Sequence, residues 1–102
     1  MPTLEEARIY LGIDYADDVV DLNILRALTD AAAYLESAVG EDIQKYLPDN
    51  PKVDRLILAY AQDLYDERGT SAKAGNAKRE MIHSMELQLR LELARAREEA
   101  GV

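Results

Sequence analysis

Apolar residues recur at helical spacing in four segments of the chain. In the long segment that follows Asp18, they fall on two adjacent stripes spaced by threes and fours. The first stripe comprises Leu25, Leu28, Ala32, Leu35 and Val39, and the second Val20, Ile24, Ala27, Ala31, Tyr34 and Ala38. This spacing predicts an α-helix, and so wide an apolar face predicts that the helix is central in the fold.

Residue types suited to helix ends set the predicted boundaries. Thr3 and Glu6 form a capping-box pattern at the start of a short first helix, which is expected to stop at Gly12. Either Asp17 or Asp18 can cap the central helix, because an aspartate oxygen accepts hydrogen bonds from the free N–H groups of a first turn. The sequence therefore predicts a short helix, an acidic turn and then the long central helix.

The segment from Gly40 to Asn50 is predicted to be a loop, because two prolines bracket an Asp-Asn pair at its end. Asn50 then caps a third helix with Pro51 at its first position, where a missing N–H costs nothing. Arg68 is placed in the last turn of this helix, and Gly69 closes it. The buried face is expected to comprise Val53, Leu56, Ile57, Tyr60, Ala61 and Leu64.

The last third of the chain is predicted to be a mobile loop over residues 69–76 and a helix from about Ala77 to Glu99. The predicted apolar stripe of this helix is Met81, Met85, Leu89 and Leu93. Leucines at four alternate positions, 87 to 93, have instead the period of a strand. We predict a helix, because no β-branched residue lies between Ser84 and Ala100 and no partner strand is available. Leucines on all sides of a helix also predict that a neighbouring subunit covers part of it.

The 102 residues correspond to one domain, residues 1–102, of the all-α class with about four helices. Two long central helices are expected between a short N-terminal helix and a long C-terminal one, with residues 91–102 as a charged helical extension. The absence of cysteine excludes disulfides and thiol chemistry. We expect a soluble, untargeted protein, because the chain has neither a signal-peptide pattern nor an apolar run of about 18 residues.

Charge is distributed unevenly along the chain. Residues 1–67 contain 15 acidic and 5 basic residues, a net charge of −10, whereas residues 68–102 contain 5 acidic and 7 basic residues, a net charge of +2. The total of −8 argues against binding a nucleic-acid backbone as the main function. The asymmetry predicts either a head-to-tail contact between copies, of the kind that closes into rings, or attraction between two surfaces of one molecule.

No pattern in the sequence predicts catalytic, cofactor-binding or metal-binding residues. An aspartate cluster after the first helix lacks the glycine and glutamate of a calcium loop, so helix capping is the preferred interpretation. Glu80 and His83 have the spacing of one Glu-x-x-His ligand pair, whereas a di-iron bundle needs two. A metal held by Glu80 and His83 at a subunit interface is the enzymatic alternative. The aspartates of the cluster after the first helix, considered for calcium, are Asp14, Asp17, Asp18 and Asp21.

Two features of the sequence suit contacts with a partner. All six aromatic residues are tyrosine, which combines a large apolar ring with a hydroxyl that tolerates a wet edge. A basic segment without any acid comprises Arg68, Lys73, Lys78 and Arg79. This segment supports an alternative function, a small helical regulatory, DNA-binding or host-interaction protein.

Four short motifs carry a family resemblance that covers about residues 3 to 90. They are Tyr10-Leu11-Gly12-Ile13-Asp14, Ala32-Ala33-Tyr34-Leu35-Glu36 before Gly40, Leu64-Tyr65-Asp66-Glu67-Arg68, and Ser84-Met85 with Gln88-Leu89-Arg90. In order and spacing they resemble the head-tail connector (adaptor) proteins of long-tailed bacteriophages, a small helical family with a Gln-Leu-Arg motif, also labelled putative phage DNA-packaging proteins. The chain departs from that pattern at Leu91, where the family commonly has glycine, and it continues as charged helix to Val102.

The resemblance implies a non-enzymatic ring of about a dozen copies beneath the portal, which extends the DNA channel and joins capsid to tail. The implied partners are further copies, the portal protein and a downstream connector or tail-completion protein, with DNA only as passing cargo. No membrane, cofactor or small-molecule substrate is implied. The implied location is the head–tail junction of the virion, after synthesis in the bacterial host cytoplasm. By carry-over, Tyr65 and Arg68 would fix the third helix, and Gln88, Leu89 and Arg90 would lie at the packing edge of the fourth. Together with Lys78 and Arg79 of the basic segment, these are the predicted interface residues.

Overall fold

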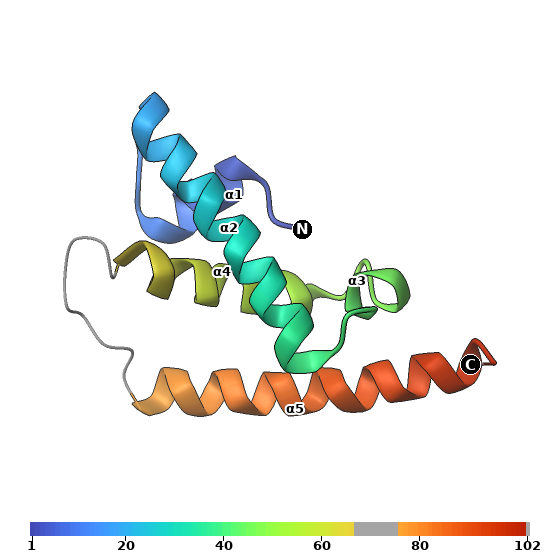
Figure 1. Ribbon diagram of the computed structural model, residues 1–102. Coiled ribbons are helices and arrows are strands. Elements are labelled where there is room, and N and C mark those ends of the chain that lie inside the picture. Colours follow the sequence, from blue (N-terminus) through green and yellow to red (C-terminus); the bar gives the residue numbers. More distant parts are fainter. Residues whose placement is uncertain (67–75, 102) are drawn as a thin grey trace.

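The computed structural model describes residues 1–66 and 76–101, which form helices and turns without any strand (Figure 1). The predicted all-α class is confirmed for this part of the chain. Arg68 and the predicted loop lie outside the described residues, except for Asn76, which begins the last helix. The helices are α1 (Leu4–Leu11), α2 (Asp18–Val39), α3 (Ile43–Tyr46), α4 (Pro51–Asp66) and α5 (Asn76–Glu99).

The capping residues at the amino-terminal end form the predicted contacts. The Thr3 hydroxyl accepts a hydrogen bond from the N–H of Glu6 at 3.1 Å, and the Glu6 carboxylate accepts one from the N–H of Thr3 at 3.1 Å. Gly12 ends α1 with φ 76°, a left-handed conformation that glycine adopts without a Cβ clash. Asp17 caps α2 by accepting hydrogen bonds from two backbone N–H groups of its first turn. Helix capping therefore accounts for Asp17 without a calcium ion.

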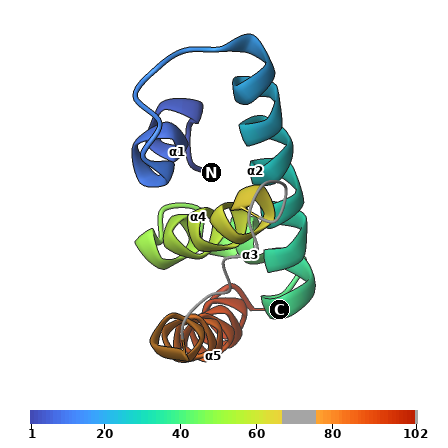
Figure 2. The ribbon, with the colours of Figure 1, turned by 90° about the vertical axis from the view of Figure 1, so that its left-hand side faces the viewer.

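Helix α2 is central, as its wide apolar face predicts. It crosses α4, with which it shares its largest contact, and it also contacts α1 and α5 (Figures 1 and 2). Its buried residues are Ile24, Ala27, Leu28, Ala31 and Leu35. Two members of the predicted apolar stripes, Leu25 and Tyr34, remain 45% and 57% exposed. The apolar face is thus wider than the surface that this one molecule covers.

The predicted loop after α2 contains a short helix, α3, so the described residues form five helices rather than about four. Ile43, the first residue of α3, is fully buried, and α3 packs against α5. Burial of the Ile43 side chain stabilises this short helical turn. The prolines later in the segment had predicted a loop instead. Asn50 then caps α4 as predicted, since its side-chain oxygen accepts a hydrogen bond from the N–H of Lys52 at 2.9 Å.

The alternating leucines lie on a helix, so the helical prediction for α5 is confirmed. Leu89 and Leu93 are 0% exposed, whereas Leu87 and Leu91 are 55% and 62% exposed. The predicted buried stripe is wrong at Met81, which is 51% exposed. The residues of α5 that are buried are Ile82, Glu86, Leu89 and Leu93. None of the described helices has the length and apolar content needed to cross a membrane.

Two basic side chains of α5 form ion pairs with acidic residues from the earlier part of the chain. The Lys78 ammonium lies 3.1 Å from the Asp63 carboxylate on α4, and the Arg97 guanidinium donates a 2.7 Å hydrogen bond to Asp42, just before α3. Some acidic residues of the first two thirds of the chain are therefore paired with basic residues of the last third within one molecule.

The Asp42–Arg97 pair predicts a pH dependence of stability. The hydrogen bond from Arg97 lowers the pKa of Asp42. Such a carboxylate stabilises the fold above its unfolded-state pKa, and this contribution is lost as the pH falls through the lower folded-state pKa. We expect the wild type to be more stable than Asp42→Asn at neutral pH, and the difference to shrink below about pH 4. Urea unfolding at several pH values measures this difference, and a difference independent of pH would contradict the prediction.

Candidate functional site

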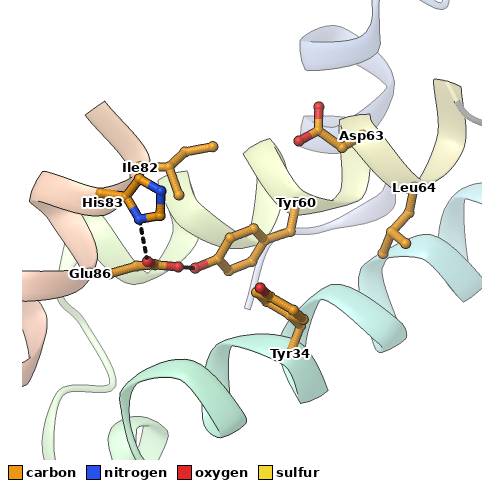
Figure 3. A pocket seen from close by; sticks show the side chains of 7 residues that line it. All are labelled: Tyr34, Tyr60, Asp63, Leu64, Ile82, His83 and Glu86. Atoms are coloured by element: carbon orange, nitrogen blue, oxygen red, sulfur yellow. Dashed lines mark hydrogen bonds and ion pairs between the residues drawn. The ribbon is translucent and has the colours of Figure 1, made fainter. Parts of the chain in front are cut away.

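A pocket of about 330 Å³ opens where α2, α4 and α5 meet (Figure 3). Helix α2 contributes one lining residue, and α4 and α5 contribute three each. The lining residues are Tyr34, Tyr60, Asp63, Leu64, Ile82, His83 and Glu86. We call this site the Tyr34–Glu86 pocket.

Helical spacing explains why these side chains line one site. Tyr60 is followed by Asp63 and Leu64 three and four residues later, so the three share one face of α4. On α5, Ile82 and Glu86 are four residues apart and share a face in the same way. The pocket therefore follows directly from the packing of α4 against α5, with a ring from α2 added at its edge.

The pocket contains a buried carboxylate. Glu86 is 7% exposed and is the one buried charged residue in the described part of the chain. The Tyr60 hydroxyl donates a hydrogen bond to Glu86 Oε2, and His83 Nδ1 lies 3.4 Å from Glu86 Oε1 (Figure 3). Because an unpaired buried carboxylate is costly, these two partners make its burial tolerable.

Tyr60 acts as a hydrogen-bond donor at neutral pH. Burial, the hydrogen bond to Glu86 and the nearby Glu86 charge all raise the pKa of Tyr60 above its ordinary value. The phenol therefore keeps its proton over the physiological range, and the carboxylate remains the acceptor.

The tyrosine rings give the pocket an aromatic wall. Tyr34 and Tyr60 meet edge to face, with ring centroids 4.8 Å apart and an angle of 69° between the ring planes. Tyr34 remains largely exposed, so its ring is available to a ligand. Aromatic faces beside a carboxylate attract organic cations, whereas the seven lining residues include no serine, threonine, cysteine or lysine nucleophile. The arrangement is suited to binding.

Metal-binding geometry is not found in the residues that the structure describes, where no group of three or more His, Asp or Glu side chains could hold an ion. His83 faces Glu86 and is 78% exposed at its side chain. Of the aspartates considered for calcium, Asp21 forms an ion pair with Arg8 instead.

Comparison with known proteins returns no relative: no family model matches the chain, and no curated protein or solved structure does.

The Gln-Leu-Arg segment of the predicted interface divides between surface and core. Leu89 is fully buried in the molecule's own core, which differs from the expected packing edge, because its neighbours already cover the side chain. Gln88 is exposed, and its amide donates to the Ser84 hydroxyl at 3.2 Å. Arg90 is exposed too, and its Nε donates to the carbonyl of Ala38 at 2.9 Å, which ties α5 to the end of α2. Only Gln88 and Arg90 of this segment are accessible to a partner.

Among the other predicted interface residues, Lys78 and Arg79 lie in the first turn of α5, and Tyr65 lies near the end of α4. Lys78 donates to the Gln62 side chain at 2.6 Å as well as to Asp63, so its charge is largely engaged within the molecule. Arg79 is exposed, and Tyr65 is partly buried against the core. Arg68 lies outside the described residues.

None of the three residues at the centre of the pocket, Tyr34, Tyr60 and Glu86, was among the site residues predicted from the sequence. One signal in the sequence could have found Glu86. It occupies the register of Ile82, Leu89 and Leu93, which is the buried stripe of α5. A carboxylate in such a stripe requires a partner inside the fold, and Tyr60 could not be assigned as that partner before the helices were placed.

Proposed function

We propose that the chain is a non-enzymatic head-completion protein of a bacteriophage or prophage. It forms an oligomeric ring beneath the portal, extends the DNA channel and joins capsid to tail. The assignment to a bacteriophage head rests on the four sequence motifs that resemble head-tail connector proteins. The physical observation that supports it most directly is the apolar helix surface that a single copy leaves uncovered.

Two exposed apolar stripes lie on different helices. On α2, Val19, Leu22 and Leu25 follow one another at three-residue intervals and are 68%, 48% and 45% exposed. On α5, Leu87 and Leu91 are one turn apart and more than half exposed. Single exposed leucines are ordinary, whereas aligned ones on a helix are typical of a surface that another protein covers. A ring offers such cover, because each copy then contacts two neighbours through different surfaces.

The charge of the chain is compatible with a channel for DNA. Residues 1–67 carry a net charge of −10, and an acidic surface repels the phosphate backbone. A channel lined by such a surface would let DNA slide through without binding.

The proposal is tested by mixing the purified chain with the portal protein encoded in the same genome. We expect a ring docked on the portal, observed by native mass spectrometry and electron microscopy. The double variant Leu87→Glu/Leu91→Glu should fold but fail to join the ring, whereas Lys45→Glu, at an exposed position on α3, should still join it. A wild-type chain that stays monomeric and never binds the portal would contradict the proposal.

The alternative, a regulator that binds DNA through residues 68–79, has less support from the described residues. Lys78 is engaged with Gln62 and Asp63, which leaves Arg79 as the exposed base on the described part of this segment. Retention of the chain on DNA that weakens steeply with salt would favour this alternative.

A further inference from the structure

The Tyr34–Glu86 pocket has the composition of a site for a basic side chain. Leu64 and Ile82 offer apolar contact to the methylene groups of a long side chain, and the exposed Tyr34 ring offers its face to the cation. The pocket holds two carboxylates: Asp63, whose side chain is 40% exposed and pairs with Lys78, and Glu86, whose side chain is 9% exposed. A carboxylate has about four lone-pair positions, and Tyr60 and His83 occupy only two of those on Glu86.

Arginine fits these features better than lysine. Its planar guanidinium stacks on an aromatic ring and can reach a carboxylate with a second edge at the same time, whereas an ammonium is a compact and strongly hydrated charge. The mostly exposed His83 side chain lies beside Glu86 Oε1, and it can swing towards solvent to admit the incoming group.

Arg95 is an exposed arginine in the part of α5 that lies away from the pocket, and among the described residues it has no ion-pair partner. It follows Leu87 and Leu91 at four-residue intervals, so the three side chains form one ridge along α5. A contact surface that runs along this ridge would bury Arg95 together with the two exposed leucines.

We infer that the Tyr34–Glu86 pocket of one copy binds the guanidinium group of Arg95 from a neighbouring copy. This inference rests on the proposed function, because it assigns the contact between adjacent subunits of the ring.

Helix geometry makes this contact head-to-tail. Arg95 lies nine residues after Glu86, which corresponds to about 14 Å along α5 and about two and a half turns, and so to opposite sides of the helix. Arg95 therefore cannot reach the pocket of its own chain. Donor and acceptor are different surfaces of the same molecule, and repetition of such a contact gives a ring or a filament.

The experiment pairs two variants that each keep half of the contact. Arg95→Gln keeps the pocket and loses the donor, and Tyr34→Ala keeps the donor and loses the exposed ring. NMR spectra are recorded on isotope-labelled Arg95→Gln while unlabelled Tyr34→Ala is added to about 1 mM, a range in which weak contacts are populated. We expect the signals of Tyr60, His83 and Glu86 to shift in this mixture. We expect no shift when unlabelled Arg95→Gln is added instead.

Self-association of each variant on its own shows how much Arg95 and Tyr34 contribute to the affinity between copies. Each should associate at least about tenfold more weakly than the wild type in sedimentation, as expected for loss of a cation–π contact. The matched controls are Tyr15→Ala, which removes a tyrosine that is also 57% exposed, and Arg26→Gln, which removes an exposed arginine on α2. Both should associate as the wild type does.

Unchanged pocket signals in the mixture, or loss of association in Arg26→Gln but not in Arg95→Gln, would overturn the inference. Portal binding by the wild type is measured separately. If the chain docks on the portal while the pocket signals stay unchanged, the inference fails and the proposed function stands. If the pocket signals shift but the portal is not bound, the contact is real and the proposed function fails.

Discussion

Leu89→Ala is expected to lower the free energy of unfolding by about 2–5 kcal/mol, because it removes a fully buried side chain and leaves a cavity in the core. Leu89 packs in the cluster that holds α5 against α2 and α4, so the loss should loosen the whole last helix. Urea unfolding followed by circular dichroism measures the change.

The matched control is Leu91→Ala, on the same helix two residues later. Its side chain is 62% exposed, so the same substitution should change the free energy of unfolding by less than about 0.5 kcal/mol. In a strand these two leucines would face the same side, and the two variants would then behave alike. Equal losses would contradict the helical packing of α5.

Tyr60→Phe is expected to lower the free energy of unfolding by about 1–3 kcal/mol, because it leaves Glu86 buried without the hydroxyl that donates to it. The substitution keeps the ring and its edge-to-face contact with Tyr34. The loss therefore reports on the hydrogen bond rather than on packing.

A second variant makes that interpretation testable. In Tyr60→Phe/Glu86→Met both polar partners are replaced by apolar groups of similar size, and no buried carboxylate remains. We expect the double variant to recover most of the stability lost in Tyr60→Phe, since replacing a buried polar pair together is often neutral. Urea unfolding of wild type, both single variants and the double variant gives the coupling energy. A double variant less stable than Tyr60→Phe would contradict the role assigned to the pair.

Local signals predicted the ends of the first two helices and the start of α4 correctly. The capping contacts of Thr3, Asp17 and Asn50 and the left-handed turn at Gly12 depend on residues only a few positions apart, so the sequence contains all the information needed. The short helix α3 was missed because it depends on Ile43 and on packing against α5, where Arg97 pairs with Asp42 from 55 residues further along the chain. Its own four residues carry too little signal to predict a helix.

The candidate site was harder to predict because its residues come from three helices. Periodicity predicted which faces of α2 and α4 are apolar, and Tyr60 was assigned to a buried face correctly. It did not predict that Glu86 would face Tyr60 from α5, or that Ile82 rather than Met81 would be buried there. Those outcomes depend on the rotation of α5 about its own axis.

For this protein the sequence alone determined the helical class, most helix boundaries and the uneven charge, because each follows from neighbouring residues or from composition. Only the tertiary structure decided that Ile82 and Glu86 rather than Met81 are buried on α5, where the carboxylate of Glu86 finds its partners, and which apolar stripes stay exposed. The physical reason is that a helix with leucines on several sides can pack by more than one face. The choice among those faces is made by contacts with α2 and α4, which lie far away in the chain.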